Sequence, residues 1–134
     1  MPQRGIVPPA QARSERPIRR LGRWLKANSA RRPQEGESME LFIFVRVHAK
    51  PGNEPEVEDS LREIVPPSGE EAGCLYIRAF RSIRDPRLFY IHSRWKDEAA
   101  FDLHAKMPHT LRFVERVEPL LVEDIQAQRC TMLA

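Results

Sequence analysis

The sequence predicts an α+β fold with the element order β-α-β-β-α-β. Three segments, 41–50, 74–82 and 88–95, are rich in β-branched and aromatic residues, as strands are. Elsewhere apolar residues recur at helical spacing, and clusters of Pro, Gly and Asn mark the turns. This order is the ferredoxin-like arrangement, in which helices cover one face of a single sheet. A chain of 134 residues is long enough for one such domain.

The first predicted strand, 41–50, is apolar on both faces in its first half. Leu41 and Ile43 point to one side, and Phe42 and Phe44 point to the other. A sheet that contains such a strand is covered on both sides. Because the helices cover only one side, we expect a second copy of the chain to cover the other, and we predict a homodimer.

The first helix is expected after the turn at 51–53, with Asn53 as its N-cap. Val57, Leu61 and Ile64 then fall on one helical face, which we expect to pack on the sheet. The Pro-Pro-Ser-Gly segment at 66–69 is expected to end this helix.

The segments 74–82 and 88–95 predict an antiparallel hairpin joined by a loop at 83–87. Asp97 is the expected N-cap of a second helix.

The second helix is expected to break at Met107-Pro108 and to continue over 110–117, since proline removes a backbone donor. Pro119 is expected to close it, and 121–129 is the predicted last strand.

Charge divides the chain into a basic arm, residues 1–38, and a folded domain, residues 39–134. The arm holds nine Lys and Arg against three acids, and the domain holds thirteen against sixteen. The pI of about 9.2 therefore comes from the arm, and we expect no nucleic-acid partner. We expect the Pro- and Arg-rich arm to be disordered or partly helical over 17–32. Alternatively, Met39 is the true start of the protein.

The lengths of the apolar runs and the number of cysteines indicate the cellular compartment. No apolar run approaches the roughly 20 residues that a membrane-spanning helix needs, so we expect no membrane insertion. The two cysteines are too few for a disulfide framework, and we expect reduced thiols and a cytoplasmic protein.

His104 and His109, on either side of the predicted helix break, are the candidate catalytic residues. They stand five positions apart with Pro108 between them, so they do not share a helix face as paired metal ligands would, and we expect no metal site. No acidic residue can be assigned to them from the sequence. The alternative interpretation is that they cap the break and bind backbone groups. The scattered glycines form no phosphate loop, and no cofactor is expected.

Between residues 39 and 129 the chain resembles the antibiotic biosynthesis monooxygenase family. The resemblance is carried by the ordered set Lys50-Pro51-Gly52, Gly73-Cys74-Leu75, Arg81-Ser82, Asp85-Pro86, Phe89, Trp95-Lys96-Asp97-Glu98, His104 and Pro108-His109. It implies a homodimeric α/β barrel that oxygenates a quinol or another aromatic small molecule without metal or flavin. On this interpretation His104 and His109 act in catalysis. The expected substrate-binding residues are Trp95, Phe44, Arg46, Ser93 and Phe89.

Two positions depart from the family pattern. The family usually has Tyr where this chain has Ile77, and Glu where this chain has Ser93. Two alternatives to the oxygenase therefore stay open. One is a non-catalytic dimeric module that binds an apolar ligand or only assembles. The other is a small-molecule isomerase, because relatives with that role share the His104…Pro108-His109 pattern.

Overall fold

The structure is a computed structural model that describes residues 39–134; the predictions for residues 1–38 lie outside the described residues. The elements are, in chain order, β1 (Leu41–His48), α2 (Glu54–Gly69), β2 (Cys74–Arg81), β3 (Leu88–Trp95), α3 (Glu98–His104), α4 (Pro108–Val117), the 3-10 turn η2 (Glu118–Leu120) and β4 (Gln126–Cys130). The predicted α+β fold and its element order are confirmed. No helix within the described residues is long and apolar enough to cross a membrane.

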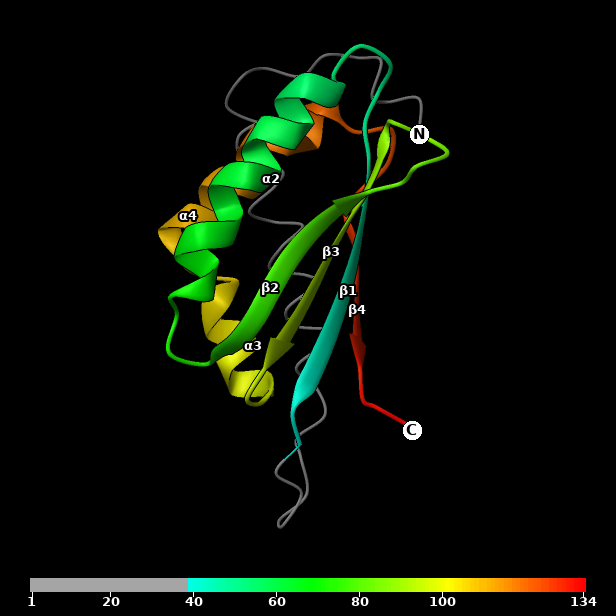
Figure 1. Cartoon of the computed structure of the whole chain (residues 1–134). Helices are drawn as coiled ribbons and strands as arrows, with labels where there is room; N and C mark the ends of the chain where they lie inside the picture. The colour runs from blue at the N-terminus through cyan, green and yellow to red at the C-terminus, as the bar shows by residue number, and fades with distance from the viewer. Residues whose placement is uncertain (1–38) are drawn as a thin grey trace.

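The four strands form one antiparallel sheet in the order β2-β3-β1-β4. β1 lies in the interior of the sheet and pairs with β3 along its whole length, from Leu41 opposite Trp95 to His48 opposite Leu88. Figure 1 shows α2, α3 and α4 together on one side of this sheet. This is the ferredoxin-like arrangement that the sequence predicts.

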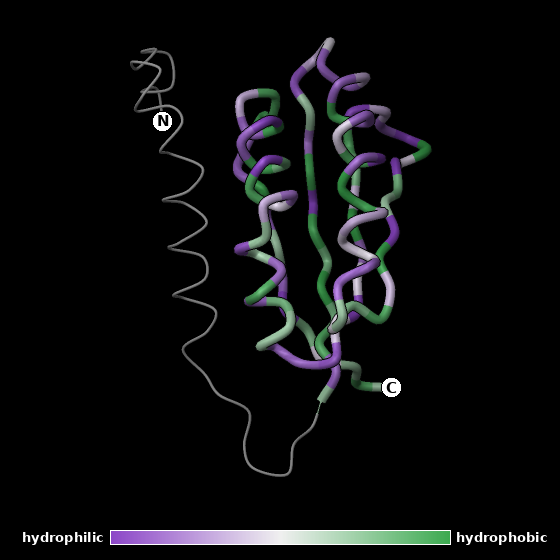
Figure 2. The backbone as a smooth tube through the Cα atoms, turned by 90° about the vertical axis from the view of Figure 1, so that its left-hand side faces the viewer, coloured by the Kyte–Doolittle hydropathy of each residue, from purple (hydrophilic) through white to green (hydrophobic). Residues whose placement is uncertain are grey.

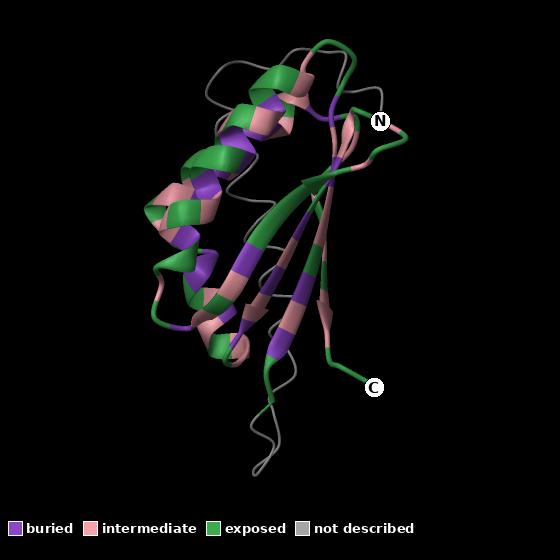
Figure 3. Cartoon of the chain, in the orientation of Figure 1, coloured by how far each residue is buried: buried purple, intermediate pink, exposed green. Residues whose placement is uncertain are grey.

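The hydrophobic core lies between the sheet and the helices. β1 contributes Ile43 and Val47, and α2 contributes Val57 and Leu61, all of them at most 2% exposed. Figure 3 shows the buried residues of α2 on its side toward the sheet. Figure 2 shows hydrophilic and hydrophobic residues alternating along the helices, as amphipathic helices require. Burying each such aliphatic side chain contributes about 1.5–3 kcal/mol.

The face of the sheet without helices, which we call the open face, is aromatic and basic. Phe44 is 48% exposed and Phe80 is 51% exposed, although both are large apolar side chains. Strand alternation places the following residues on this face: Phe42, Phe44, Arg46, Tyr76, Arg78, Phe80, Tyr90, His92 and Arg94. The ring of His92 stacks on that of Phe44 with a centroid distance of 4.4 Å.

The first helix differs in detail from its prediction. It ends at Gly69, but Pro66 and Pro67 lie inside it and do not terminate it. Proline has a helical φ angle, and the cost is limited to the two bonds that N–H groups at Pro66 and Pro67 would have donated to the carbonyls four residues earlier. The amide of Glu70 closes this turn by donating to the Pro67 carbonyl at 3.2 Å. Asn53 occupies the N-cap position, but its side chain makes no capping hydrogen bond.

The predicted last strand, 121–129, is wrong in its first half. Leu121 forms an isolated bridge with Ala49, and regular pairing with β1 begins only at Gln126 and ends at Cys130. Between these two points the four residues 122–125 lie opposite only two residues of the neighbouring strand β1, 47 and 48. The two extra residues cannot stay in register, and the segment leaves the sheet.

Arg129 on β4 forms ion pairs with two acidic residues of α3. The guanidinium of Arg129 donates to Glu98 at 2.8 Å and to Asp102 at 2.9 Å. It also lies over the ring of Phe101, 5.0 Å from its centroid. Only 7% of the Arg129 side chain is exposed. Charge-assisted bonds in such a protected setting stabilise more than surface ion pairs do.

The approach of the β2 edge to α3 requires glycine at position 73. A Cβ atom on Gly73 would lie 2.4 Å from the Cβ of Ala100. We expect Gly73→Ala to lower the free energy of unfolding by about 1–3 kcal/mol or more, as overpacking does. Thermal and urea denaturation measure this loss. Gly69→Ala is the matched control, because its Cβ would meet only the Ile77 methyl at an ordinary 3.6 Å.

The Ala100→Gly background tests the cause of that loss. Ala100→Gly alone should cost about 1 kcal/mol through helix propensity. Adding Gly73→Ala to it should then cost little, because the clashing Cβ has gone. An equal loss in both backgrounds would contradict the close approach.

Candidate functional site

The break between α3 and α4 brings the two candidate histidines together. Asp97 caps α3, as predicted, by accepting a hydrogen bond from the Ala100 amide at 2.9 Å. α3 ends at His104 and α4 begins at Pro108, so the predicted interruption is confirmed. His109 is the second residue of α4, and its ring centroid lies 6.0 Å from that of His104.

Glu71 joins the two histidines through a single carboxylate oxygen. Its Oε2 lies 2.7 Å from Nδ1 of His104 and 2.6 Å from Nε2 of His109. The three side chains are between 8% and 15% exposed. Glu71 comes from the loop before β2, and Cys74 at the start of β2 pairs with Trp95 at the end of β3. We call Glu71, His104 and His109 the Glu71 cluster.

The contacts define where the ring protons lie. A carboxylate oxygen only accepts, so Nδ1 of His104 and Nε2 of His109 are the donors in these two bonds. Burial lowers the pKa of His104 below its usual 6.5, although the hydrogen bond and the charge of Glu71 oppose this effect. Burial therefore favours the neutral form of the His104 imidazole. Its Nε2 is left as an acceptor, which is the arrangement of a carboxylate-oriented general base.

Trp95 forms the aromatic wall behind His104. The two rings are 4.6 Å apart between centroids, and Phe101 lies 5.5 Å from the same imidazole. Trp95 is fully buried and donates its indole N–H to the Ser93 hydroxyl at 2.9 Å. The hydroxyl of Thr110, also buried, lies 3.3 Å from Nδ1 of His104. A proton-accepting group in such surroundings is shielded from bulk water.

Glu71 was missed by the sequence interpretation, in which no acidic residue was assigned to the histidines. The predicted hairpin contained the necessary signal. Its two strands meet at Cys74 and Trp95, so the residues just before the first lie beside those just after the second. The interpretation that His104 and His109 bind backbone groups is likewise replaced, since their ring nitrogens lie on the Glu71 carboxylate.

The seven residues predicted for the site lie in three places. His104, His109, Trp95 and Ser93 meet at the Glu71 cluster. Phe89 points to the same side of the sheet but lies at the far end of β3, six residues or about 20 Å from Trp95.

Phe44 and Arg46 are on the open face, across the sheet from the histidines. There the guanidinium of Arg46 pairs with the carboxylate of Glu123. These two residues cannot touch a ligand at the Glu71 cluster of the same chain.

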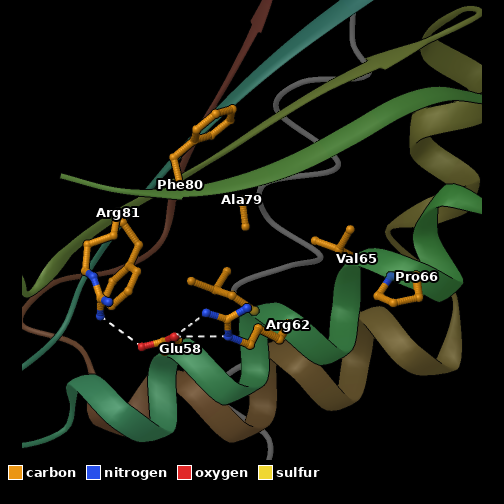
Figure 4. Close-up of a pocket in the computed structure, with 9 residues that line it drawn as sticks. Glu58, Arg62, Val65, Pro66, Ala79, Phe80 and Arg81 are labelled. Atoms are coloured by element: carbon orange, nitrogen blue, oxygen red, sulfur yellow. Dashed lines mark hydrogen bonds and ion pairs between the residues drawn. The ribbon is translucent and has the colours of Figure 1, made fainter. Parts of the chain in front are cut away.

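Phe89 lines a groove of about 350 Å³ between α2 and β2 (Figure 4). In this groove Glu58 accepts hydrogen bonds from Arg62 at 2.6 Å and from Arg81 at 2.9 Å. Leu61 and Val65 supply apolar lining. We call it the α2–β2 groove; its distance from His104 means that a molecule bound there does not reach the cluster.

A second groove, of about 180 Å³, runs between α2 and α4 and reaches the cluster. Its lining includes His109 together with Arg112, Arg116 and Phe113. His109 thus has one face on Glu71 and another on the surface. Of the cluster, His109 alone lines this α2–α4 groove.

The cluster also has the composition of a metal site. The ligand atoms of Glu71, His104 and His109 all lie within 4.8 Å of one another. The spacing argument against a shared ion fails, because the helix break turns both rings toward one carboxylate. Cys74 is not a further ligand of this group; burial, and then the charge of Glu71, raise the pKa of its thiol.

Comparison with known proteins gives a consistent result. Residues 41–116, more than half of the chain, match the family described as antibiotic biosynthesis monooxygenase. The Pseudomonas aeruginosa protein PA3566 is 34% identical with a TM-score of 0.69, over 75% of this chain and 100% of that one. A crystal structure of an antibiotic biosynthesis monooxygenase is 26% identical with a TM-score of 0.67, over 70% and 99%. The Mycobacterium tuberculosis protein Rv0793, 20% identical over 71% and 96% with a TM-score of 0.67, shares the fold.

Proposed function

The chain belongs to the antibiotic biosynthesis monooxygenase family, and from this premise we propose that it oxygenates a quinol or a related aromatic small molecule without a cofactor. The observation that carries the proposal is the imidazole of His104, hydrogen-bonded to Glu71 and packed against the ring of Trp95. A deprotonated hydroquinone ring is electron-rich enough to react with O₂ directly. The protein then has to bind the ring, take a phenolic proton and exclude water.

The proposed reaction balances without an outside reductant. His104 Nε2 accepts the phenolic proton, and Glu71 stabilises the imidazolium that forms, as in other carboxylate–histidine pairs. The ring carbanion forms a new C–O bond with O₂. The O–O bond then breaks, so that one oxygen atom stays on the ring and the other leaves as water, which takes up the phenolic proton held by His104 and a second proton released from the ring. All four electrons that reduce O₂ come from the quinol, which ends as a hydroxyquinone.

The two departures from the family pattern meet in one place. Ile77 on β2 lies directly opposite Ser93 on β3, and both are buried. The hydroxyl of Ser93 accepts the indole N–H of Trp95, so this position keeps a polar role without a charge. We propose that Glu71 supplies the carboxylate that position 93 lacks. Glu71 reaches the same tryptophan through His104.

We propose a homodimer whose interface is the open face. Exposed rings of this size are uncommon on a monomer's surface and mark interfaces. Arginine and aromatic residues are also the types enriched in the centre of interfaces. Phe44 and Arg46, predicted for substrate binding, would then serve assembly. A cytoplasmic location belongs to the same proposal, and the two free cysteines support it.

Phe44→Glu should dissociate this dimer. Phe44 is at the centre of the open face, on β1, and a buried unpaired carboxylate there would cost several kcal/mol of association. Sedimentation equilibrium of the full chain at micromolar concentration should give a dimer for the unaltered protein and a monomer for the variant. Leu103→Glu is the control, since Leu103 is 61% exposed on α3, on the other side of the sheet. A monomer before any substitution would refute the proposal.

Oxygen uptake tests the activity. The purified chain, treated with chelator and free of flavin, is offered a panel of reduced quinols and polycyclic phenols in an oxygen electrode. Uptake above the autoxidation rate, with one ¹⁸O atom in the product, is the expected result. Uptake that depends on added flavin or metal would contradict the cofactor-free reaction. Saturable binding without uptake would favour the second candidate, a ligand-binding module that uses the α2–β2 groove.

A further inference from the structure

We propose that the Glu71 cluster also binds Zn²⁺ or a similar divalent transition-metal ion, and that the bound ion inhibits the proposed oxygenation. Two imidazoles and one carboxylate form the ligand set that proteins use for zinc sites with an open fourth position. Imidazole nitrogen selects such ions over Mg²⁺ and Ca²⁺, which prefer oxygen ligands. The binding itself does not depend on the proposed function; only the inhibition does.

The geometry is close to what an ion requires. Zinc ligands stand about 2.0–2.2 Å from the metal, so a tetrahedral site separates them by roughly 3.4 Å. Here Oε2 of Glu71 is 2.7 Å from one ring nitrogen and 2.6 Å from the other. All three donor atoms lie within 4.8 Å of one another. To hold an ion, Oε2 must move about 0.7–0.8 Å further from each ring nitrogen, and the two nitrogens, at most 4.8 Å apart, must approach by up to about 1.4 Å, which rotations of the Glu71 and His109 side chains would supply.

The donors are held in place and can be reached. The Glu71 side chain is 8% exposed, and Trp95 and Phe101 pack against His104. Holding the ligands in this way lowers the entropic cost of binding, as the supporting groups around metal sites do. His109 lines the α2–α4 groove, and we expect an ion to enter from there.

Ion binding would reverse the roles of the two nitrogens of His104. Without an ion, Nδ1 carries the proton toward Glu71 and Nε2 is the acceptor. An ion bound through Nδ1 displaces that proton, and a neutral imidazole then carries its only hydrogen on Nε2. Nε2 becomes a donor and cannot take a phenolic proton. The metal-bound protein should therefore be inactive, with its fold intact.

Isothermal titration calorimetry of the full chain with ZnCl₂, in chelator-treated buffer, tests the binding. We expect one ion per chain. Glu71→Gln and His109→Gln should each weaken the affinity by about 100-fold or more, since even outer-shell changes cost 10–100-fold. His48→Gln is the matched control, because His48 also faces a carboxylate, Asp85 at 3.5 Å, but at a different place. It should bind zinc like the unaltered chain.

Thermal melting with and without zinc separates a lost site from a lost fold. Zinc at 100 times its dissociation constant should stabilise the chain by about 2.7 kcal/mol and raise its Tm, and it should leave the Tm of Glu71→Gln unchanged. Equal zinc affinity in the chain and in both cluster variants would overturn the proposal, as would no binding at all. Zinc that binds without slowing an established oxygenation would overturn the inhibition alone. If no oxygenation is found, the calorimetric result still stands.

Discussion

His104→Ala should lower kcat/KM for the oxygenated substrate by about 10²–10⁴-fold, the usual contribution of a general base. The substitution removes the Nε2 acceptor, and it leaves Glu71 hydrogen-bonded to His109. Most of the loss should appear in kcat, because the proton is transferred in the reaction and not on binding. Steady-state oxygen uptake at saturating and at limiting quinol separates the two parameters.

Glu71→Gln provides the companion measurement. The glutamine keeps the size of the side chain and one acceptor oxygen, but it removes the negative charge that stabilises the imidazolium. Its activity should fall in kcat also, with a Tm near that of the unaltered chain. A variant that loses its fold in parallel with its activity would mark the histidine as a structural cap. Unchanged turnover in His104→Ala would remove this residue from the reaction.

Trp95→Ala should have the largest effect on stability. Trp95 is 0% exposed and packs against Leu41, Ile43 and Phe101 in the part of the core beneath α3. Removing a buried aromatic ring of this size costs about 3–5 kcal/mol. For a domain of this length the Tm should fall by roughly 10–20 °C. Differential scanning calorimetry measures the change.

The control for Trp95 is Leu103→Ala. Leu103 lies on α3 close to the same core, but it is 61% exposed, and surface substitutions usually change stability by less than about 0.5 kcal/mol. Trp95→Phe should fall between the two, because it keeps an aromatic wall for His104 and loses the hydrogen bond to Ser93. A small loss in Trp95→Ala would mean that the core beneath α3 can collapse around the cavity.

The parts of the fold that depend on neighbouring residues could be predicted from the sequence. Asp97 caps α3 because an N-cap needs only its own turn, and Pro108 starts α4 for the same reason. The prediction of the last strand was wrong because the boundary of this strand depends on its pairing with a distant segment. Nothing within 121–129 indicates that four residues there would face only two.

The site was predictable only in part for a similar reason. His104 and His109 could be selected because they flank the predicted helix break. Their partner Glu71 is 33 and 38 residues away in the sequence. Its position depends on the register of the β2–β3 hairpin and on the close contact of Gly73 with Ala100. Alternation along β1 did predict that Phe44 and Arg46 face away from Ile43. The resemblance nevertheless grouped them with Trp95, which lies on the opposite side of the sheet.

The hydrogen bonds from Arg129 to α3 link the C-terminal strand to the helix that carries His104. β4 has only five residues and pairs with β1 alone, so by itself it would open easily and exchange its amide hydrogens fast. Glu98 and Asp102 hold it to the helix whose last residue is His104. We expect strand and helix to open as one unit. We therefore expect contacts that displace the C-terminal strand to disturb the hydrogen bond between His104 and Glu71 as well.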